Sequence, residues 1–194
     1  MISQAMWNSK VVLHSVRSEM SIAQHVQTIL LAPLGAECEN FMANTYSQIY
    51  IQTVFAVDGR LSLIRAEFKE ELYKYMTGIV RNKRQKLIAI NGMSDHAHIL
   101  IGVKPAMALA DLVRDIKADS SDFINRKKWV RGRFAWQEGY GAFSCGHSQL
   151  DTVIRYIQNQ ERHHRRRTFK DEYVMWLKKF EVSYDERFVF RFID

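Results

Sequence analysis

Hydrophobic and polar residues follow two different periods after residue 42, and the changes of period mark the expected elements. Alternation, as at Ile49, Ile51 and Phe55, is typical of a strand with one buried side. Apolar residues spaced by three and four positions are typical of an amphipathic helix. The pattern predicts six elements in the order strand, helix, strand, strand, helix, strand: 45–57, 66–82, 87–90, 96–103, 109–124 and a last strand within 134–145.

This order predicts an α+β fold of the ferredoxin-like split βαβ type, in which two helices cover one face of an antiparallel sheet. Two further helices are expected after it, each opened by a capping box in which Asp follows Ser or Thr by three residues. The first box, at 148–151, predicts a helix through about His164. The second box, at 168–171, predicts a helix through about Phe180.

The segment 1–41 differs from the rest of the chain, because its hydrophobic periodicity is weak. It holds two basic and three acidic residues, which gives it a net charge of −1. The net charge of the 194-residue chain is +7, so residues 42–194 carry +8. We therefore expect two parts: an N-terminal extension, 1–41, which need not be part of the natural protein, and a folded domain, 42–194. The basic surplus of that domain favours nucleic acid as a partner.

The overall composition indicates an ordinary globular protein, with neither a membrane-spanning helix nor a disulfide scaffold. Hydrophobic residues make up 47% and charged residues 25% of the chain. The two cysteines, Cys38 and Cys145, do not have the spacing of metal ligands, and no apolar run reaches the roughly 18 residues that a membrane helix needs. These features predict a cytoplasmic protein with no membrane partner.

His96 and His98 form the first candidate site. Residues two apart on a strand point to the same side of a sheet, so both imidazoles project together, away from the face that Ala97, Ile99 and Ile101 offer to the two helices. We therefore expect them on the sheet face that those helices leave free, where two imidazoles can chelate a divalent ion. On its own, such a pair is more often two incidental surface histidines than a metal site.

Tyr156 and Gln160 form the second candidate site. They lie four residues apart on an expected helix, so both side chains share one helix face. A phenol with a pKa near 10 needs a cation or a base before it becomes a good nucleophile, and the Gln160 oxygen is a neutral metal ligand. The alternative is an ordinary amphipathic tyrosine beside a solvated glutamine.

Together, a His-Ala-His strand and a Tyr-Ile-Gln-Asn-Gln helix some sixty residues later resemble the single-tyrosine HUH transposases of small bacterial insertion sequences, which are related to the REP-associated tyrosine transposases. The resemblance covers about 42–194. It also includes three longer segments: 42–50, 87–100 and 134–144. Residues 1–41 have no counterpart in it.

The resemblance implies a DNA transposase that cuts and rejoins single-stranded DNA at insertion-sequence ends through a 5′-phosphotyrosine intermediate. It implies Tyr156 as the nucleophile and His96, His98 and Gln160 as ligands of Mg²⁺ or Mn²⁺. It further implies single-stranded DNA with hairpin ends as the partner, and a homodimer whose active sites are shared between subunits. Glycines at 139, 141 and 146 would let the tyrosine helix be exchanged between chains.

Basic residues near the expected helix ends are candidates for phosphate contact. They lie in two groups, after the tyrosine helix and after the first helix: Arg162, Arg165, Arg166 and Arg167; Lys83 and Arg84. Two other functions remain open from the sequence. One is a domesticated or replication-type HUH nicking enzyme with the same chemistry, and the other is a non-catalytic ferredoxin-like protein that binds nucleic acid.

Overall fold

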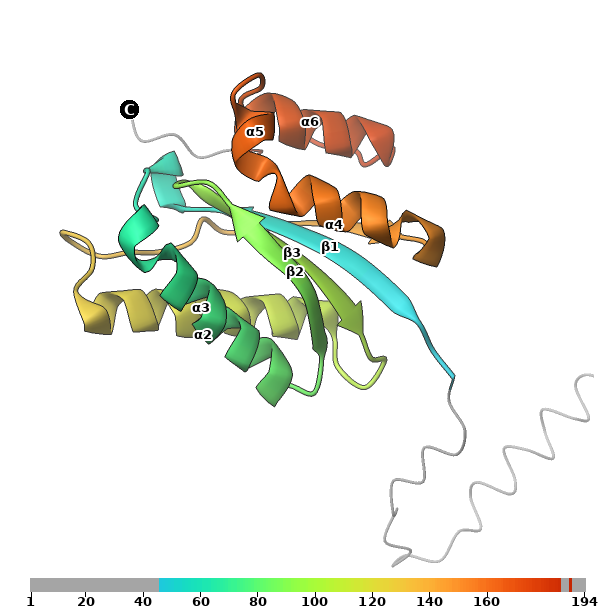
Figure 1. The fold of residues 1–194 in the computed structure, drawn as a ribbon, viewed down its shortest axis with the longest axis horizontal. Coiled ribbons are helices and arrows are strands. Elements are labelled where there is room, and N and C mark those ends of the chain that lie inside the picture. Colours follow the sequence, from blue (N-terminus) through green and yellow to red (C-terminus); the bar gives the residue numbers. More distant parts are fainter. Residues whose placement is uncertain (1–45, 186–188, 190–194) are drawn as a thin grey trace, which may run out of the picture. The chain divides into compact units, whose positions relative to one another are not determined.

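The computed structural model describes residues 46–185 and residue 189 (Figure 1). The chain divides into two units, 1–45 and 46–194, and the second holds every element described below. The expected extension, 1–41, lies outside the described residues. The four strands are β1 (Ile49–Ala56), β2 (Lys86–Gly92), β3 (His96–Val103) and β4 (Gly141–Cys145). The α-helices are α2 (Ala66–Asn82), α3 (Leu109–Lys127), α4 (Leu150–Gln158), α5 (Gln160–His164) and α6 (Phe169–Lys179).

The strands form one antiparallel sheet in the order β2-β3-β1-β4. Strands β1 and β3 are the central pair, and α2 and α3 connect β1 to β2 and β3 to β4. This is the predicted ferredoxin-like arrangement, so the α+β fold class is confirmed. None of the helices among the described residues is long and apolar enough to cross a membrane.

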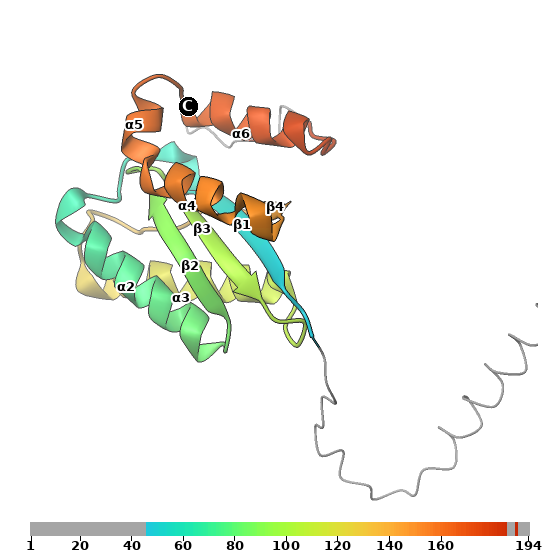
Figure 2. The ribbon, with the colours of Figure 1, turned by 45° about the vertical axis from the view of Figure 1, so that its right-hand side comes forward.

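Helices α2 and α3 cover one face of the sheet (Figure 2). The apolar side of β3, Ala97, Ile99 and Ile101, is fully buried against them. The apolar stripe of α2 supplies Leu72 and Met76 to the same core, as its periodicity predicts. The alternation of β3 therefore commits its odd-numbered residues to the α2–α3 core.

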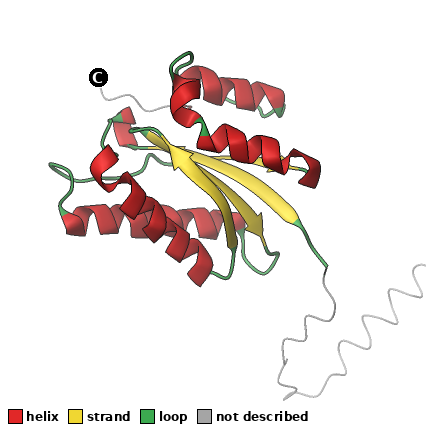
Figure 3. Ribbon diagram, in the orientation of Figure 1, coloured by secondary structure: helices red, strands yellow, loops and turns green. Residues whose placement is uncertain are grey.

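The opposite face of the sheet is covered as well. Helices α4, α5 and α6 lie over it (Figure 3). Leu100 of β3 packs there with Val153 and Ile157 of α4, and Val54 of β1 packs with Trp176 of α6. The expectation that the histidine face is free holds for α2 and α3 only, because the C-terminal helices cover that face and leave both histidines fully buried.

The entry to the tyrosine helix differs from the expected one. No capping box forms at Ser148 within the described chain; instead the Gln149 Oε1 atom accepts a hydrogen bond from the Gly146 backbone N–H at 3.0 Å. A short 3-10 turn, His147–Gln149, precedes α4. The second expected capping box does form, since Thr168 Oγ1 accepts from Asp171 N–H at the start of α6.

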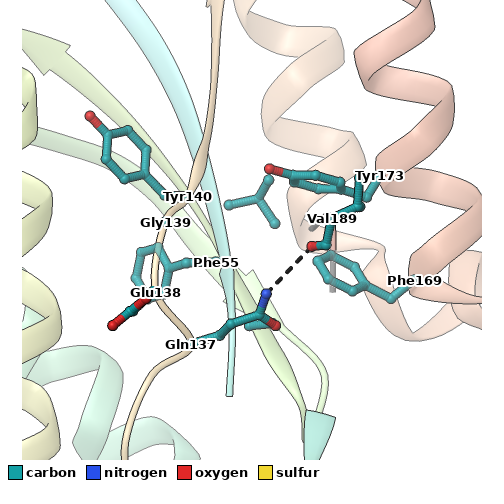
Figure 4. A pocket seen from close by; sticks show the side chains of 10 residues that line it. Phe55, Gln137, Glu138, Gly139, Tyr140, Phe169, Tyr173 and Val189 are labelled. Atoms are coloured by element: carbon teal, nitrogen blue, oxygen red, sulfur yellow. Dashed lines mark hydrogen bonds between the residues drawn. The ribbon is translucent and has the colours of Figure 1, made fainter. Parts of the chain in front are cut away.

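Helix α6 approaches the end of the sheet closely. A Cβ atom added to Gly141, the first residue of β4, would lie 2.8 Å from the Tyr173 ring, so only glycine fits there. Figure 4 shows Tyr173 and Phe169 of α6 around a small cavity beside the segment that leads into β4. In that segment Gln137 donates a hydrogen bond from Nε2 to the Val189 carbonyl oxygen at 3.4 Å. The close approach of Tyr173 to Gly141 therefore brings α6 against the sheet, whereas the bond from Gln137 reaches a residue beyond α6.

We expect a chain that starts at Met42 to fold as the full chain does, because every described element lies after residue 46. The melting temperature should change by less than about 2 °C, which corresponds to less than about 1 kcal/mol for a domain of this size. A chain that starts at Thr53 removes half of β1 and is the matched control for damage. A large loss of soluble protein from the Met42 chain would show that 1–41 packs on the domain.

Candidate functional site

The two histidines of β3 lie side by side beneath the C-terminal helices. Both His96 and His98 are 0% exposed, and their ring centroids are 5.1 Å apart. Phe169 of α6 stacks on the His96 ring, with centroids 4.0 Å apart. Fully buried imidazoles need partners for their polar atoms, so the contacts of each nitrogen decide what the pair can bind.

The partners of His96 fix its protonation. Its Nδ1 atom lies 2.7 Å from the Asp95 carboxylate, which accepts only, so Nδ1 carries the proton and Nε2 presents a lone pair. Arg60 in turn donates from Nε to Asp95 at 3.0 Å. Burial lowers the pKa of His96 to about 4. Burial alone would raise the pKa of Asp95, but the hydrogen bonds and charges of His96 and Arg60 lower it to about 2.

One ring nitrogen of His98 has a hydrogen-bond partner, whereas two nearby buried atoms have none. Its Nδ1 atom lies 3.2 Å from the Gln52 amide nitrogen. Within the described chain, His98 Nε2 and Gln52 Oε1 have no hydrogen-bond partner although both are buried. Turning the Gln52 amide over lets Oε1 accept from Nδ1–H and leaves the Nε2 lone pair free. Both histidines can then present Nε2 to one ion, with Nδ1 held by a protein oxygen as is usual for metal ligands.

The expected continuous helix through His164 is interrupted at Asn159. Helix α4 ends at Gln158 and α5 begins at Gln160, and the Asn159 side chain donates to the Arg155 carbonyl at 2.8 Å. Gln160 is 0% exposed, and its Oε1 atom lies 3.5 Å from His96 Nε2. The break therefore leaves Gln160 directed at the histidine pair.

Tyr156 lies at the edge of the same site. It is half-buried on α4, and its ring meets the His98 ring edge-on with centroids 5.9 Å apart. Trp176 of α6 donates from Nε1 to the Tyr156 hydroxyl at 3.0 Å. Tyr156 also lines a cavity of about 850 Å³ between β4, α4 and α6 and a second of about 520 Å³ beside α5. The hydroxyl-bearing ring thus has the buried histidines on one side and open space on the other.

Two further residues join the site that were not expected from the sequence. His164 of α5 and Glu172 of α6 present ligand atoms that lie, with those of His96 and His98, all within 4.8 Å of one another. Glu172 follows the second capping box by one residue, and His164 follows Gln160 by one helical turn. Neither spacing is a recognisable linear motif. Glu172 reaches β3 only because α6 packs on the sheet, and the sequence pattern does not show that packing.

The basic residues expected to contact phosphate lie in two regions of the structure, and only one of them is near Tyr156. Three of the arginines line the 520 Å³ cavity beside Tyr156: Arg162, Arg166 and Arg167. Arg165 is exposed at the end of α5. Lys83 and Arg84 precede the first residue of β2, whereas the histidine site lies at the other end of that strand, and Lys83 pairs with Asp115. The structure therefore does not bring these two residues to the site.

A family model described as IS200-like transposase matches residues 45–160, which is more than half of the chain. The chain belongs to the IS200-like transposase family. The ISDra2 transposase TnpA of Deinococcus radiodurans is 21% identical over 118 residues, covering 58% of this chain and 84% of the relative. The match to the family includes the histidine pair, Tyr156 and Gln160, and it ends before His164 and Glu172.

Two solved structures are similar in part to this transposase. One is a candidate transposase from Deinococcus radiodurans, 20% identical, with a TM-score of 0.47, covering 60% of this chain and 94% of the other. The second is a REP-associated tyrosine transposase bound to a REP hairpin, 13% identical, with a TM-score of 0.49, covering 62% of this chain and 72% of the other.

We expect His96 of the metal-free transposase to stay neutral down to about pH 5, because burial lowers its pKa to about 4. The folded pKa lies below the unfolded value, so this histidine's contribution to stability is complete above about pH 6.5. It is lost as the pH falls towards 4, and it is on the order of 3 kcal/mol. Side-chain NMR titration and urea unfolding between pH 7 and 4 measure both effects. A ring that protonates near pH 6.5 would contradict the expected burial.

Proposed function

We propose that this transposase cuts and rejoins single-stranded DNA at insertion-sequence ends, with Tyr156 as the nucleophile. His96, His98 and Gln160 would hold a divalent ion, Mg²⁺ or Mn²⁺. The observation that most supports this is the contact between Tyr156 and His98 at a buried site where two imidazole Nε2 atoms and the Gln160 oxygen face one another. Family membership supports the same chemistry.

The residues fit a metal ion on two grounds. His98 Nε2 is a buried nitrogen that no described residue satisfies, and the Nδ1 atom of His96 is held by a carboxylate in the manner of a metal ligand. When bound, the ion would polarise the scissile phosphate and offset the charge that develops on its oxygens.

Tyr156 performs the covalent step. Its hydroxyl oxygen forms a bond to the phosphorus while the bond from phosphorus to the 3′ oxygen breaks, which leaves a 5′-phosphotyrosine. The phenol gives its proton to solvent, and the departing 3′ oxygen takes one from solvent to become a free 3′-OH. The hydrogen bond from Trp176 to the tyrosine oxygen favours the phenolate that forms as the proton leaves. The phosphate remains an ester throughout, so rejoining by attack of a 3′-OH needs no ATP.

The DNA strand would run past α5. Arg162, Arg166 and Arg167 surround the cavity that Tyr156 lines, and guanidinium groups there suit the phosphates on either side of the scissile bond. Family membership supports single-stranded DNA with hairpin ends as the substrate. Contacts from Arg165, Lys83 and Arg84 would be more distant, and Lys83 and Arg84 require DNA that reaches the other end of β2.

Replacing Tyr156 with Phe should abolish covalent protein–DNA adducts and keep DNA affinity within about twofold of wild type. One oxygen is removed, while the ring contacts with His98 and Trp176 remain. Adducts are measured by denaturing gel electrophoresis with labelled single-stranded DNA, and affinity by anisotropy. Tyr173→Phe is the matched control on α6. Adducts that persist in Tyr156→Phe would contradict the assignment.

A homodimer with shared active sites remains a prediction, because one chain by itself places Tyr156 against its own His98. Mixing Tyr156→Phe with a His96→Ala, His98→Ala double variant tests it. If helices are exchanged, each mixed dimer contains one intact site, and cleavage should return to a substantial fraction of wild type. Continued inactivity in a mixture that demonstrably exchanges subunits would show that each site is built within one chain.

A further inference from the structure

Glu172 is a fully buried carboxylate with an unusual set of partners. It is 0% exposed, and the ion-pair partners that the described residues offer it are all histidines: His98, His163 and His164. Gln160 donates to Glu172 Oε1 from Nε2 at 3.2 Å. A buried carboxylate without a lysine or arginine partner is costly unless another cation compensates it.

The nearest histidine is not a ready hydrogen-bond donor. His164 Nε2 lies 2.8 Å from Glu172 Oε2, which is close enough for a hydrogen bond. However, His164 Nδ1 lies 3.1 Å from the Arg167 carbonyl oxygen, which only accepts, so Nδ1 carries the proton of the neutral ring. The Nε2 atom then faces Glu172 with a lone pair, and within the described chain Glu172 Oε2 has no hydrogen-bond partner.

The same reasoning applies to the rest of the cluster. His96 uses its proton towards Asp95, so its Nε2 atom also presents a lone pair inward. Gln160 Oε1, an acceptor, lies 3.0 Å from His164 Nε2 and 3.5 Å from His96 Nε2. Acceptors from β3, α5 and α6 thus converge on one buried point.

Such a convergence requires a positive charge at its centre. Donors bound to one ion at roughly 2.0–2.2 Å lie about 3 to 4.5 Å from one another. The ligand atoms of His96, His98, His164 and Glu172 meet this spacing closely, since all lie within 4.8 Å of one another.

We propose that His164 and Glu172 are additional ligands of the divalent ion, so that the site contains three imidazoles and a carboxylate beside Gln160. This inference rests on the proposed function, and it changes the expected metal. Imidazole donors suit Mn²⁺, Co²⁺ and Zn²⁺ better than Mg²⁺, which takes mainly oxygen ligands and keeps several waters. The transposase should therefore discriminate strongly against Mg²⁺. Because its ligands come from β3, α5 and α6, the ion should also hold α6 onto the sheet.

The test measures Mn²⁺ binding by the full chain at pH 7.5, using the electron paramagnetic resonance signal of free Mn²⁺. The variants are Glu172→Gln and His164→Gln. Their matched controls are Glu161→Gln, whose side chain is 72% exposed, and His147→Gln, at an exposed position outside the cluster. We expect each site variant to weaken Mn²⁺ binding at least about tenfold, and each control to stay within about twofold. Mg²⁺ in roughly hundredfold excess should displace little Mn²⁺.

Thermal melts with and without Mn²⁺ separate a ligand from a structural hydrogen-bond acceptor. If Glu172 is a ligand, Glu172→Gln should melt no lower than wild type without metal, because a repelling acceptor is removed, and Mn²⁺ should raise its melting temperature less. If Glu172 only holds α6 through hydrogen bonds, the metal-free variant melts lower and gains as much from Mn²⁺ as wild type does. Should Glu172→Gln fail to fold, Glu172→Asp keeps the charge with a shorter reach, and the same loss of Mn²⁺ affinity is expected.

Failure of this inference can be distinguished from failure of the proposed function. Unchanged Mn²⁺ affinity in Glu172→Gln and His164→Gln, with loss of binding in His96→Gln, would overturn the additional ligands and leave the proposed metal site intact. A wild-type chain that binds neither Mn²⁺ nor Co²⁺ would overturn both. The visible spectrum of bound Co²⁺ adds an independent readout, since the loss of a ligand in either site variant should change its intensity and position.

Discussion

The pairing of β3 with β1 in a single register determines both the core and the site. His96 lies opposite Ala56 and His98 opposite Val54, and side chains alternate between the two faces along β3. Ile99 and Ile101 therefore enter the core beneath α2 and α3. A slip by one residue would turn the histidines into that apolar core and expose the isoleucines to the polar site. The hydrophobic burial that stabilises the fold thus also fixes where the imidazoles point.

The hydrophobic periodicity of the sequence predicted the elements whose ends are marked by a change in that periodicity. The bounds of α2 and β3 agree with the predicted ranges, because each has a clear period and a clear change of composition at its ends. The tyrosine helix was predicted as continuous, but it is interrupted at Asn159, whose side chain and backbone N–H both donate to the Arg155 carbonyl. Helix periodicity continues through such a break, so the sequence pattern alone does not reveal it.

The residues of the candidate site also fall into those that the sequence could identify and one that it could not. His96, His98, Tyr156 and Gln160 could be selected from the sequence because strand and helix geometry place each pair on one face, and family resemblance links the two pairs. Glu172 could not be selected, because a glutamate in the first turn of a helix is usually a solvated residue that complements the helix dipole. Its burial follows from the docking of α6 through Trp176 and Leu177, which is a property of tertiary packing.

The direction of the imidazole protons gives the buried site its chemical character. A neutral imidazole has one N–H group, and the surrounding structure determines which nitrogen carries it. Asp95 and the Arg167 carbonyl take the protons of His96 and His164 on their outer sides, and Gln52 occupies the equivalent position at His98. The inner sides are left with lone pairs, and Glu172 adds negative charge to them. Burial removes the water that would otherwise satisfy these acceptors, so the same packing that closes the fold around β3 shapes the site proposed for a cation beside Tyr156.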